Sequence, residues 1–303
     1  MFFRNLTLFR FSPALAASLT DLETALARHA LRPCGPLESV TRGFVSPFGP
    51  ESDALSHRIG DAILFTLGAE EKLLPSAVLN AELGIRLRKA AAERGRPVGA
   101  RERKRLKAEV LDVLLPRAFV RPSRLNGYVD TKNGWLVLDT ASRKAAENAL
   151  TALREALGSF PALPLAATET PRALLTGWLT HAKLPGGLTL GDECELRDPA
   201  GGAVARCRHQ ELESAEVREH LKRGKQVFQL GLIYDGRLGY VLGEDLTIRK
   251  LRFLDVVQDT LENSDGSSAA DELDARFALM SGELERLLHG LSEWFGLQRP
   301  DGE

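Results

Sequence analysis

The sequence predicts an α+β protein built from mainly antiparallel sheets with flanking helices. Two hairpin signals support this class, because alternating apolar runs flank Asn133-Gly134 and again Asp235-Gly236, dipeptides typical of two-residue β-turns. Helical segments interrupt the strands without regular strand–helix–strand alternation, and no internal repeat is visible. A parallel, doubly wound sheet is therefore not expected.

Strands and helices follow one another irregularly in the first half. Thr20 and Glu23 form a capping box ahead of one helix, and another helix runs from Ser142 to a stop at Gly158. The expected strands span residues 6–11, 62–67, 126–130 and 135–140. The first strand overlaps a short apolar stretch that resembles a signal peptide, but Pro13 and the alternating pattern favour the strand.

Pro161 and Pro164 mark a boundary between an N-terminal α+β region, residues 1–165, and a C-terminal α+β region, residues 166–303. The second region opens with a helix whose first turn holds Pro171. Its expected strands span 188–196, 203–208, 227–234, 238–242 and 246–253, with a helix over 214–223 and a tip near 188–225. The chain closes with an amphipathic helix whose apolar face comprises Phe277, Leu284, Leu288 and Leu291.

The composition is that of a soluble globular protein, with 44% apolar and 27% charged residues. The longest stretch without a charge, 13 residues from Ala156 to Thr168, is shorter than the ~20 apolar residues of a membrane-spanning helix. Cys34, Cys194 and Cys207 form no CxxC pair, which argues against a disulfide scaffold or a zinc site and favours a reducing cytoplasm. No cofactor and no metal are expected.

Charge is segregated along a chain whose net charge is only −1. From Arg86 to Arg124 there are 13 Lys and Arg against four acids, a net of +9. From Asp255 to Glu303, in the closing acidic helix and its flanks, 12 acids outnumber three bases, a net of −9. This separation indicates one surface for a polyanion and another that is solvated or repels it.

The basic segment also carries helical patterns, which predict a projecting helical hairpin over residues 76–116. Its apolar stripes are Leu79, Leu83 and Leu87 on one side and Leu106, Val110, Val113 and Leu114 on the other. The stretch between them, Gly95–Gly99, holds Pro97 and cannot continue a helix. A merely solvated face is the alternative, but a net of +9 exceeds what solubility requires, so polyanion binding is favoured.

No standard catalytic motif is present, whether a phosphate-binding loop, a dinucleotide fingerprint, a nucleophile elbow or a zinc-protease helix. Ser52, Asp53 and His57 lie close in sequence, but Ser52 is better explained as a helix cap than as a nucleophile. The acids within 192–195 could hold a hard cation, although in an alternating strand they are more typical of a solvated edge. The chain is therefore predicted not to be an enzyme.

Several motifs occur in the order found in one protein family. They are Pro33-Cys34-Gly35-Pro36, Gly43-Phe44-Val45-Ser46-Pro47, Ser52-Asp53-Ala54-Leu55, Glu71-Lys72-Leu73-Leu74-Pro75-Ser76, Leu114-Leu115-Pro116-Arg117-Ala118-Phe119, Leu157-Gly158-Ser159, Asp192-Glu193-Cys194-Glu195-Leu196 and Gly282-Glu283-Leu284. Together, in register over nearly the whole chain, they resemble the recombination-associated RdgC family of proteobacteria.

The resemblance implies a non-enzymatic DNA-binding protein of the cytoplasm and nucleoid. Members of the family form a ring-shaped homodimer, head to head and tail to tail, with a basic opening through which duplex DNA passes. They restrain RecA-dependent homologous recombination. The implied partners are therefore double-stranded DNA, a second copy of the chain and, as a functional antagonist, RecA, with no membrane.

The expected DNA-binding residues combine the basic segment with positions carried over from the family. They are Arg96, Arg101, Arg103, Lys104, Lys107, Arg117, Arg121, Arg208, Gln210 and Lys225. Arg208, His209 and Gln210 align with Lys-Lys-Gln in the family, so His209 removes a fixed charge there at neutral pH. Phe119 is either a core residue beneath the hairpin or an anchor of the dimer interface.

The residues themselves favour duplex binding with little sequence preference. Phosphate neutralisation needs many Lys and Arg but no base-reading helix, and the sequence offers no such helix. Aromatic residues make up only 6%, and Trp135, Trp178 and Trp294 lie on apolar faces, so a stacking platform for single strands is not expected. A scaffold that binds an acidic protein partner and a nuclease with a carboxylate-bound metal are the alternatives.

Overall fold

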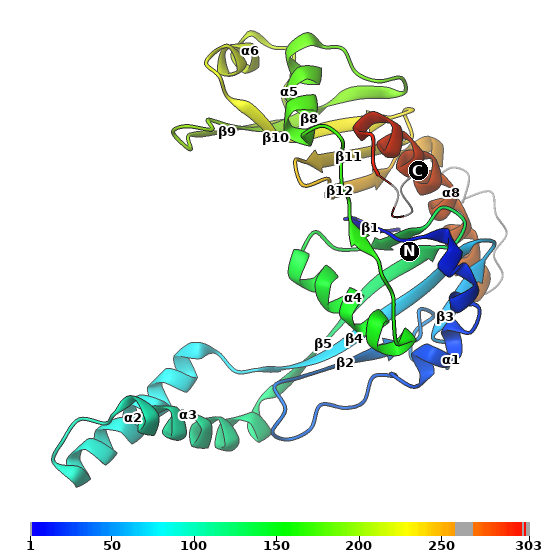
Figure 1. Cartoon of the computed structure of the whole chain (residues 1–303). Helices are drawn as coiled ribbons and strands as arrows, with labels where there is room; N and C mark the ends of the chain where they lie inside the picture. Colours follow the sequence, from blue (N-terminus) through cyan, green and yellow to red (C-terminus); the bar gives the residue numbers. More distant parts are fainter. Residues whose placement is uncertain (1, 258–268, 299, 301–303) are drawn as a thin grey trace. The chain divides into compact units, whose positions relative to one another are not determined.

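The computed structural model describes residues 2–257, 269–298 and 300, and the chain divides into two compact units (Figure 1). Unit 1 comprises Met1–Arg28, Ser46–Thr66 and Leu125–Glu303, and unit 2 comprises His29–Val45 and Leu67–Arg124. The predicted α+β class with mainly antiparallel sheets is confirmed. The boundary expected at 160–168 lies inside unit 1.

The first sheet has the strand order β2-β4-β5-β6-β1-β7, with β3 paired to β4. Its strands are β1 (Thr7–Arg10), β2 (Val40–Val45), β3 (Ser56–Ile59), β4 (Ala62–Leu73), β5 (Phe119–Asp130), β6 (Trp135–Leu138) and β7 (Leu163–Pro164). The hairpin predicted around Asn133-Gly134 is confirmed, because Asp130 pairs with Trp135 across the β5–β6 turn. Gly134 has a φ of +69°, a conformation that glycine adopts at little cost.

Helices α1 (Leu22–Ala27) and α4 (Arg143–Leu157), with the 3-10 helix η1 (Pro13–Leu19), belong to unit 1. The limits of α4 agree with the prediction, since the Ser142 hydroxyl accepts a hydrogen bond from the Ala145 amide and Gly158 ends the helix with a φ of +71°. The predicted capping box at Thr20 and Glu23 is wrong. The Glu23 carboxylate instead accepts hydrogen bonds from the Leu55 and Ser56 amides, both at 2.7 Å.

The second sheet lies in unit 1 and has the order β12-β11-β10-β8-β9. Its strands are β8 (Leu188–Arg197), β9 (Val204–Arg208), β10 (Gln226–Tyr234), β11 (Leu238–Gly243) and β12 (Ile248–Phe253), joined by α5 (Pro171–His181) and α6 (Ala215–Lys222). The second predicted hairpin is confirmed, because Tyr234 pairs with Leu238 around a turn in which Asp235 and Gly236 both have positive φ. A bridge between Leu6 and Ile248 connects this sheet to the start of the chain.

The last helix, α8 (Ala269–Phe295), buries its apolar face as predicted. Phe277, Leu284, Leu288 and Leu291 are each no more than 1% exposed. Phe277 meets Tyr128 of β5 edge to face, with ring centroids 5.8 Å apart. Part of the acidic stretch 255–303, namely 258–268, 299 and 301–303, falls outside the described residues. Among the helices that the structure describes, none is long and apolar enough to cross a membrane.

In unit 2, the segment expected to form a helical hairpin contains α2 (Ser76–Arg94), α3 (Ala100–Leu114) and the 3-10 helix η2 (Leu115–Arg117). Helix α2 stops at Gly95, which takes a left-handed φ of +65°, and Pro97 prevents its continuation. The two long helices pack together and bury Leu83, Leu106 and Val110 (Figure 1). Val113, expected in the apolar stripe, is instead 43% exposed.

Candidate nucleic-acid interface

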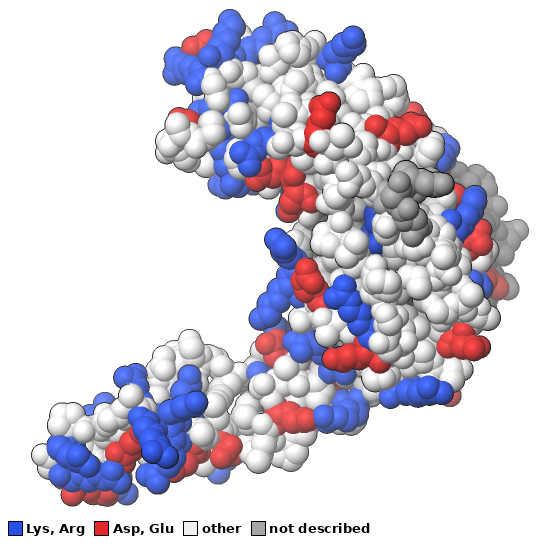
Figure 2. Space-filling model, viewed as in Figure 1, with Lys and Arg blue, Asp and Glu red and all other residues white. Residues whose placement is uncertain are grey.

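Helices α2 and α3 carry Lys and Arg over much of their surface (Figure 2). Arg101, Arg103, Lys104 and Lys107 are all exposed, as the apolar stripe of α3 predicts. Arg96 is exposed in the turn between the helices. Within the part of the chain that the structure describes, none of these five side chains has a carboxylate within ion-pairing distance.

Acids and unpaired bases occupy different flanks of α3. At 100° per residue, Arg103, Lys107, Lys104 and Arg101 cover an arc of about 160° on one side of the helix. Glu102, Arg105, Glu109 and Asp112 fall within an arc of about 80° on the other side. Arg105 lies 3.8 Å from Glu102 and 3.6 Å from Glu109, and Arg94 of α2 also pairs with Glu102. The acids of α3 therefore neutralise Arg94 and Arg105 and leave the first flank positive.

The start of β5 adds an exposed aromatic residue beside further charge. Phe119 is 83% exposed, so its interpretation as a core residue beneath the hairpin is wrong for the single chain. Arg121 donates a hydrogen bond to Glu71 at 2.6 Å, which places the end of β4 beside the start of β5. Arg117 is exposed in η2 and has no ion-pair partner among the described residues.

The tip of the second sheet, in unit 1, carries a separate group of bases (Figure 2). Arg208 is exposed at the end of β9, opposite Glu193 of β8. The Gln210 amide donates hydrogen bonds to the Ser214 hydroxyl at 3.2 Å and to Glu216 at 2.8 Å, so it is already engaged. Lys225 is half-buried after α6.

The tip also holds exposed bases that were not predicted to bind DNA. Arg218 and Lys222 are exposed on α6, and neither has an ion-pair partner among the described residues. The sequence indicates the exposure of these two bases, because Val217 and Leu221 mark the inward face of a helix and leave 218 and 222 facing solvent. His209 has a φ of 52° and its ring lies 3.1 Å from Asp192.

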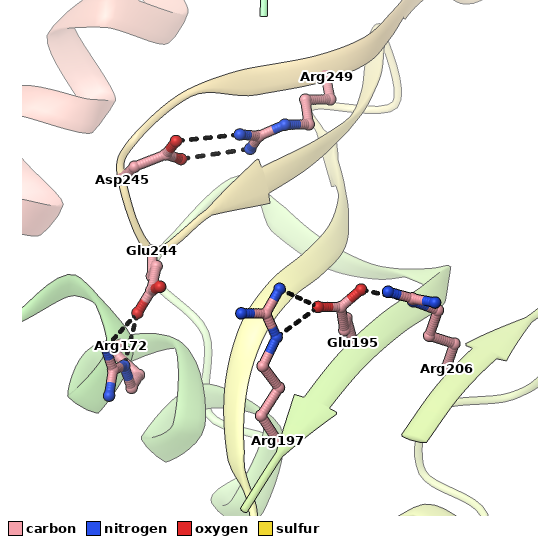
Figure 3. Close-up of polar contacts among 7 residues, drawn as sticks. All are labelled: Arg172, Glu195, Arg197, Arg206, Glu244, Asp245 and Arg249. Atoms are coloured by element: carbon pink, nitrogen blue, oxygen red, sulfur yellow. Dashed lines mark hydrogen bonds and ion pairs between the residues drawn. The ribbon is translucent and has the colours of Figure 1, made fainter. Parts of the chain in front are cut away.

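Glu195 is the buried centre of an ion-pair network on the charged face of the second sheet, whose two arginines stay partly exposed (Figure 3). Arg197 lies two residues along β8 and Arg206 is the cross-strand partner on β9, so both share the face of Glu195. Their Nε atoms donate to the two carboxylate oxygens at 2.6 and 2.7 Å. Burial opposes ionisation of Glu195, but the hydrogen bonds from Arg206 and Arg197 outweigh it and hold its pKa below the usual value.

Two neighbouring contacts stiffen the same region. Arg172 of α5 donates to Glu244 at 2.6 Å, and Arg249 pairs with Asp245 across the β11–β12 turn (Figure 3). The guanidinium groups of Arg172 and Arg197 lie 4.2 and 4.5 Å from the ring centroid of Phe228. These arginines are structural, because each is held by a carboxylate and an aromatic ring.

Of the acids within 192–195, Asp192 is exposed as expected, but the other two do not form a solvated edge. Glu195 is buried by its arginines, and Glu193 pairs with Lys250 of β12. The described residues contain no cluster of three or more metal-ligating side chains. The three carboxylates instead pair with basic side chains, Asp192 with His209, Glu193 with Lys250, and Glu195 with Arg197 and Arg206.

The Ser52, Asp53 and His57 group is not assembled as a triad. Ser52 lies in a loop, where its hydroxyl accepts a hydrogen bond from the Ala54 amide, so the expected helix cap at Ser52 is wrong as well. His57 lies on β3, with its Nε2 2.7 Å from Asp274 of α8 and its ring against Phe48. His57 thus joins β3 to α8 and is not aligned with Ser52.

Comparison with known proteins identifies the family. A family model described as "Putative exonuclease, RdgC" matches residues 1–298. The chain belongs to the RdgC family. It is 50% identical over 303 residues to the recombination-associated protein RdgC of Xanthomonas campestris pv. campestris (strain B100), covering 99% of this chain and 100% of the relative. RdgC of Stenotrophomonas maltophilia (strain R551-3) is 48% identical with the same coverage.

RdgC of Xanthomonas axonopodis pv. citri (strain 306) is 51% identical over 289 residues, which is 95% of both chains. The predicted resemblance is therefore confirmed over the whole length. The relatives are named for recombination, whereas the description of the family model names a nuclease. Membership in the RdgC family associates the chain with recombination.

Proposed function

We propose that this RdgC-family protein binds double-stranded DNA with little sequence preference, encircles it as a homodimer and thereby restrains RecA-dependent homologous recombination. The observation that carries the proposal is the flank of unpaired cations on α3. Arg101, Arg103, Lys104 and Lys107 are exposed on one side of the helix, separated from its acids.

The unpaired state of these cations matters for phosphate binding. Duplex DNA carries one negative charge per about 1.7 Å of its axis, and binding is driven by release of its counterions. A Lys or Arg that already pairs with a carboxylate must break that contact before it can neutralise a phosphate. The four cations of the α3 flank, together with Arg96 and Arg117, need no such exchange within the described residues.

The tip of the second sheet supplies a second, weaker contact in this proposal. Arg208 is exposed, and Lys225 lies close enough to Asp198 to lower the pKa of that carboxyl group, after the larger effects of hydrogen bonds from the Ala200 and Gly201 amides. Gln210 must exchange Ser214 and Glu216 for a phosphate oxygen. Arg121 must likewise give up its ion pair with Glu71 before it can contact a phosphate.

Self-association is supported by the exposed apolar residues of unit 2. Phe119 is 83% exposed, and Leu73, Val113 and Val120 are each at least 40% exposed. A large exposed aromatic residue in a unit that exposes further apolar side chains is typical of an interface anchor. A two-fold contact through Phe119, with a second self-complementary contact elsewhere, would close two chains into a ring.

Restraint of recombination follows from occupation of the duplex. A protein that binds phosphates along the duplex without reading bases competes for any duplex substrate, whatever its sequence. The names of the relatives support a role in recombination. A direct contact with RecA is not required by this mechanism.

A mobility-shift series with duplexes of unrelated sequence at several salt concentrations tests the proposal. If about six phosphates are neutralised, log K should fall with log salt with a slope near −5. A flat salt dependence, or a preference above about 100-fold for one sequence, contradicts the proposal. A polyglutamate competitor that displaces the protein better than unlabelled duplex would favour a scaffold for acidic proteins.

The description of the family model raises a nuclease as the second candidate. Incubation of the purified protein with linear and circular plasmid in the presence of magnesium distinguishes the two. We expect the length of every DNA strand to be unchanged. If linear DNA is progressively shortened, and this activity co-purifies with the protein, the protein is a nuclease instead.

A further inference from the structure

Two of the three cysteines face each other on adjacent strands of the second sheet. Cys194 of β8 and Cys207 of β9 are direct cross-strand partners in the antiparallel register. Side chains of directly opposed residues lie on the same face of a sheet. Strand β9 is an edge strand of this sheet, so β8 is its only strand neighbour within the described residues.

The geometry of an opposed pair suits a covalent link. Opposed residues in antiparallel strands have Cα atoms about 4.5–5.5 Å apart, within the range of about 4.4–6.8 Å spanned by disulfides. The two thiols also interact in the structure. Burial, followed by the neighbouring Cys207 thiol, raises the pKa of Cys194 to about 12.

The two thiols differ in access to solvent. Cys194 is 4% exposed and packs in the core of the second sheet, whereas Cys207 is half-buried on the edge strand. A small oxidant therefore reaches the Cys207 sulfur first. Cys194 is then the nearest thiol that can resolve the product.

We propose that Cys194 and Cys207 form a reversible intramolecular disulfide when the protein meets a low-molecular-weight disulfide such as oxidised glutathione. The Cys207 thiolate attacks one glutathione sulfur, so that a mixed disulfide forms and one glutathione leaves as a thiolate that takes up a proton. The Cys194 sulfur, as it loses its proton, then attacks the Cys207 sulfur and releases the second glutathione. Two protein thiols are oxidised, and one glutathione disulfide is reduced to two thiols.

This disulfide is inferred without reference to DNA binding, and its direct effect is on the edge strand. The disulfide would bond β9 covalently to β8 and close the loop that includes the turn at 198–203. Arg206 and Arg208 flank Cys207 on the opposite face of β9, so the strand that presents them would be fixed. Cys34 has no such role, because it lies in unit 2 with its thiol directed at the Glu38 carbonyl oxygen, 3.4 Å away.

The test uses the full-length protein equilibrated with a series of ratios of reduced to oxidised glutathione. Free thiols are then alkylated under denaturing conditions, and intact mass and peptide maps are recorded. We expect the wild type to lose two alkylatable thiols in one step under oxidising conditions and to yield a peptide linked through Cys194 and Cys207. Dithiothreitol should restore both thiols.

Three variants show which cysteines form the intramolecular disulfide. Cys34→Ser, the matched control, should oxidise as the wild type does. Cys194→Ser should stop at a mixed disulfide with one glutathione on Cys207, and Cys207→Ser should form no intramolecular link. In the wild type, amide hydrogen exchange of β9 should slow on oxidation. The proposal is overturned if both thiols stay alkylatable at every ratio in the wild type, or if the only linked peptides are intermolecular or contain Cys34.

Discussion

Arg237 binds both carboxylate oxygens of Glu283 and so joins the turn before β11 to the middle of α8. Arg237 Nη2 donates to one oxygen at 2.5 Å and Nε to the other at 3.0 Å. Glu283 is only 4% exposed, and Arg286 pairs with it one turn further along α8. Glu283 is thus a buried charge that two arginines compensate, at the place where the last helix packs on the second sheet.

Replacement of Glu283 by Gln should therefore destabilise the protein. The substitution keeps the shape of the side chain but leaves Arg237 without its counter-charge. We expect a loss of about 2 kcal/mol, below the ~3–5 kcal/mol of a fully buried pair because Arg237 is partly exposed. Urea unfolding followed by circular dichroism measures it.

Glu293→Gln is the matched control for this variant. Glu293 also lies on α8 and pairs with a base, His289, but both side chains are mostly exposed. Its substitution should change the stability by less than about 0.5 kcal/mol. Equal effects of the two substitutions would show that burial of the Arg237 pair contributes nothing.

Acid should weaken the protein through the same carboxylates. Burial opposes ionisation of Glu283 and Glu195, but their arginine partners outweigh it and lower both pKa values from 4.5. Since each folded-state pKa lies below the unfolded value, the stabilisation is complete above about pH 4.5 and is lost as the pH falls through the folded pKa. Urea midpoints should be nearly flat from about pH 7 to 5 and then fall.

The variant Glu195→Gln, Glu283→Gln isolates this effect. It should begin from a lower midpoint at neutral pH and lose less between about pH 5 and 3 than the wild type does. A parallel decline of both proteins would assign the acid sensitivity to other carboxylates.

The sequence predicted elements whose causes are local. The hairpin turns at Asn133-Gly134 and Asp235-Gly236, the helix start at Ser142 and the stop at Gly158 depend on residues adjacent in the chain, and the structure has all of them. The predictions from sequence were wrong where a residue distant in the chain decides the local conformation. Glu23 has the spacing of a capping box, but two amides of residues 55 and 56 compete for its carboxylate.

In the candidate nucleic-acid interface too, the sequence predicted what depends on neighbouring residues and missed what depends on distant partners. Periodicity alone placed Arg101, Arg103, Lys104 and Lys107 on the solvent side of α3. It could not show which bases are neutralised, because the pairing of Arg94 with Glu102 connects two helices and that of Glu195 with Arg206 connects two strands. The role of these unpaired bases in DNA binding stays a prediction.

Neutralisation of the α3 flank should weaken DNA binding and reduce its salt dependence. In the variant with Arg101, Arg103, Lys104 and Lys107 all changed to Gln, up to four phosphate contacts are lost. The slope of log K against log salt should therefore become less steep by about 3 to 4. Titration of a fluorescent duplex at several salt concentrations measures the slope, and unfolding curves confirm that the fold is retained.

A second fourfold variant controls for net charge. Arg28, Arg143, Lys144 and Lys183 are exposed bases of unit 1 outside the proposed contacts, and changing them to Gln removes the same charge. This control should keep the wild-type slope. If both variants lose the same number of contacts, the binding is a property of total charge and α3 has no special part in it.

Phe119 should control how long the protein remains on closed circular DNA. Its 83% exposure in the single chain means that Phe119→Ala leaves the fold intact, with a change in stability within about 0.5 kcal/mol. If Phe119 anchors one of two self-complementary contacts, its loss opens the ring while the other contact keeps the chains paired. The variant should then sediment as a dimer and bind linear duplex normally, but dissociate faster from closed circles in a competitor chase. Leu37→Ala, which removes another exposed apolar side chain of unit 2, should behave as the wild type does. Release from circles at the wild-type rate would show that Phe119 does not close the ring.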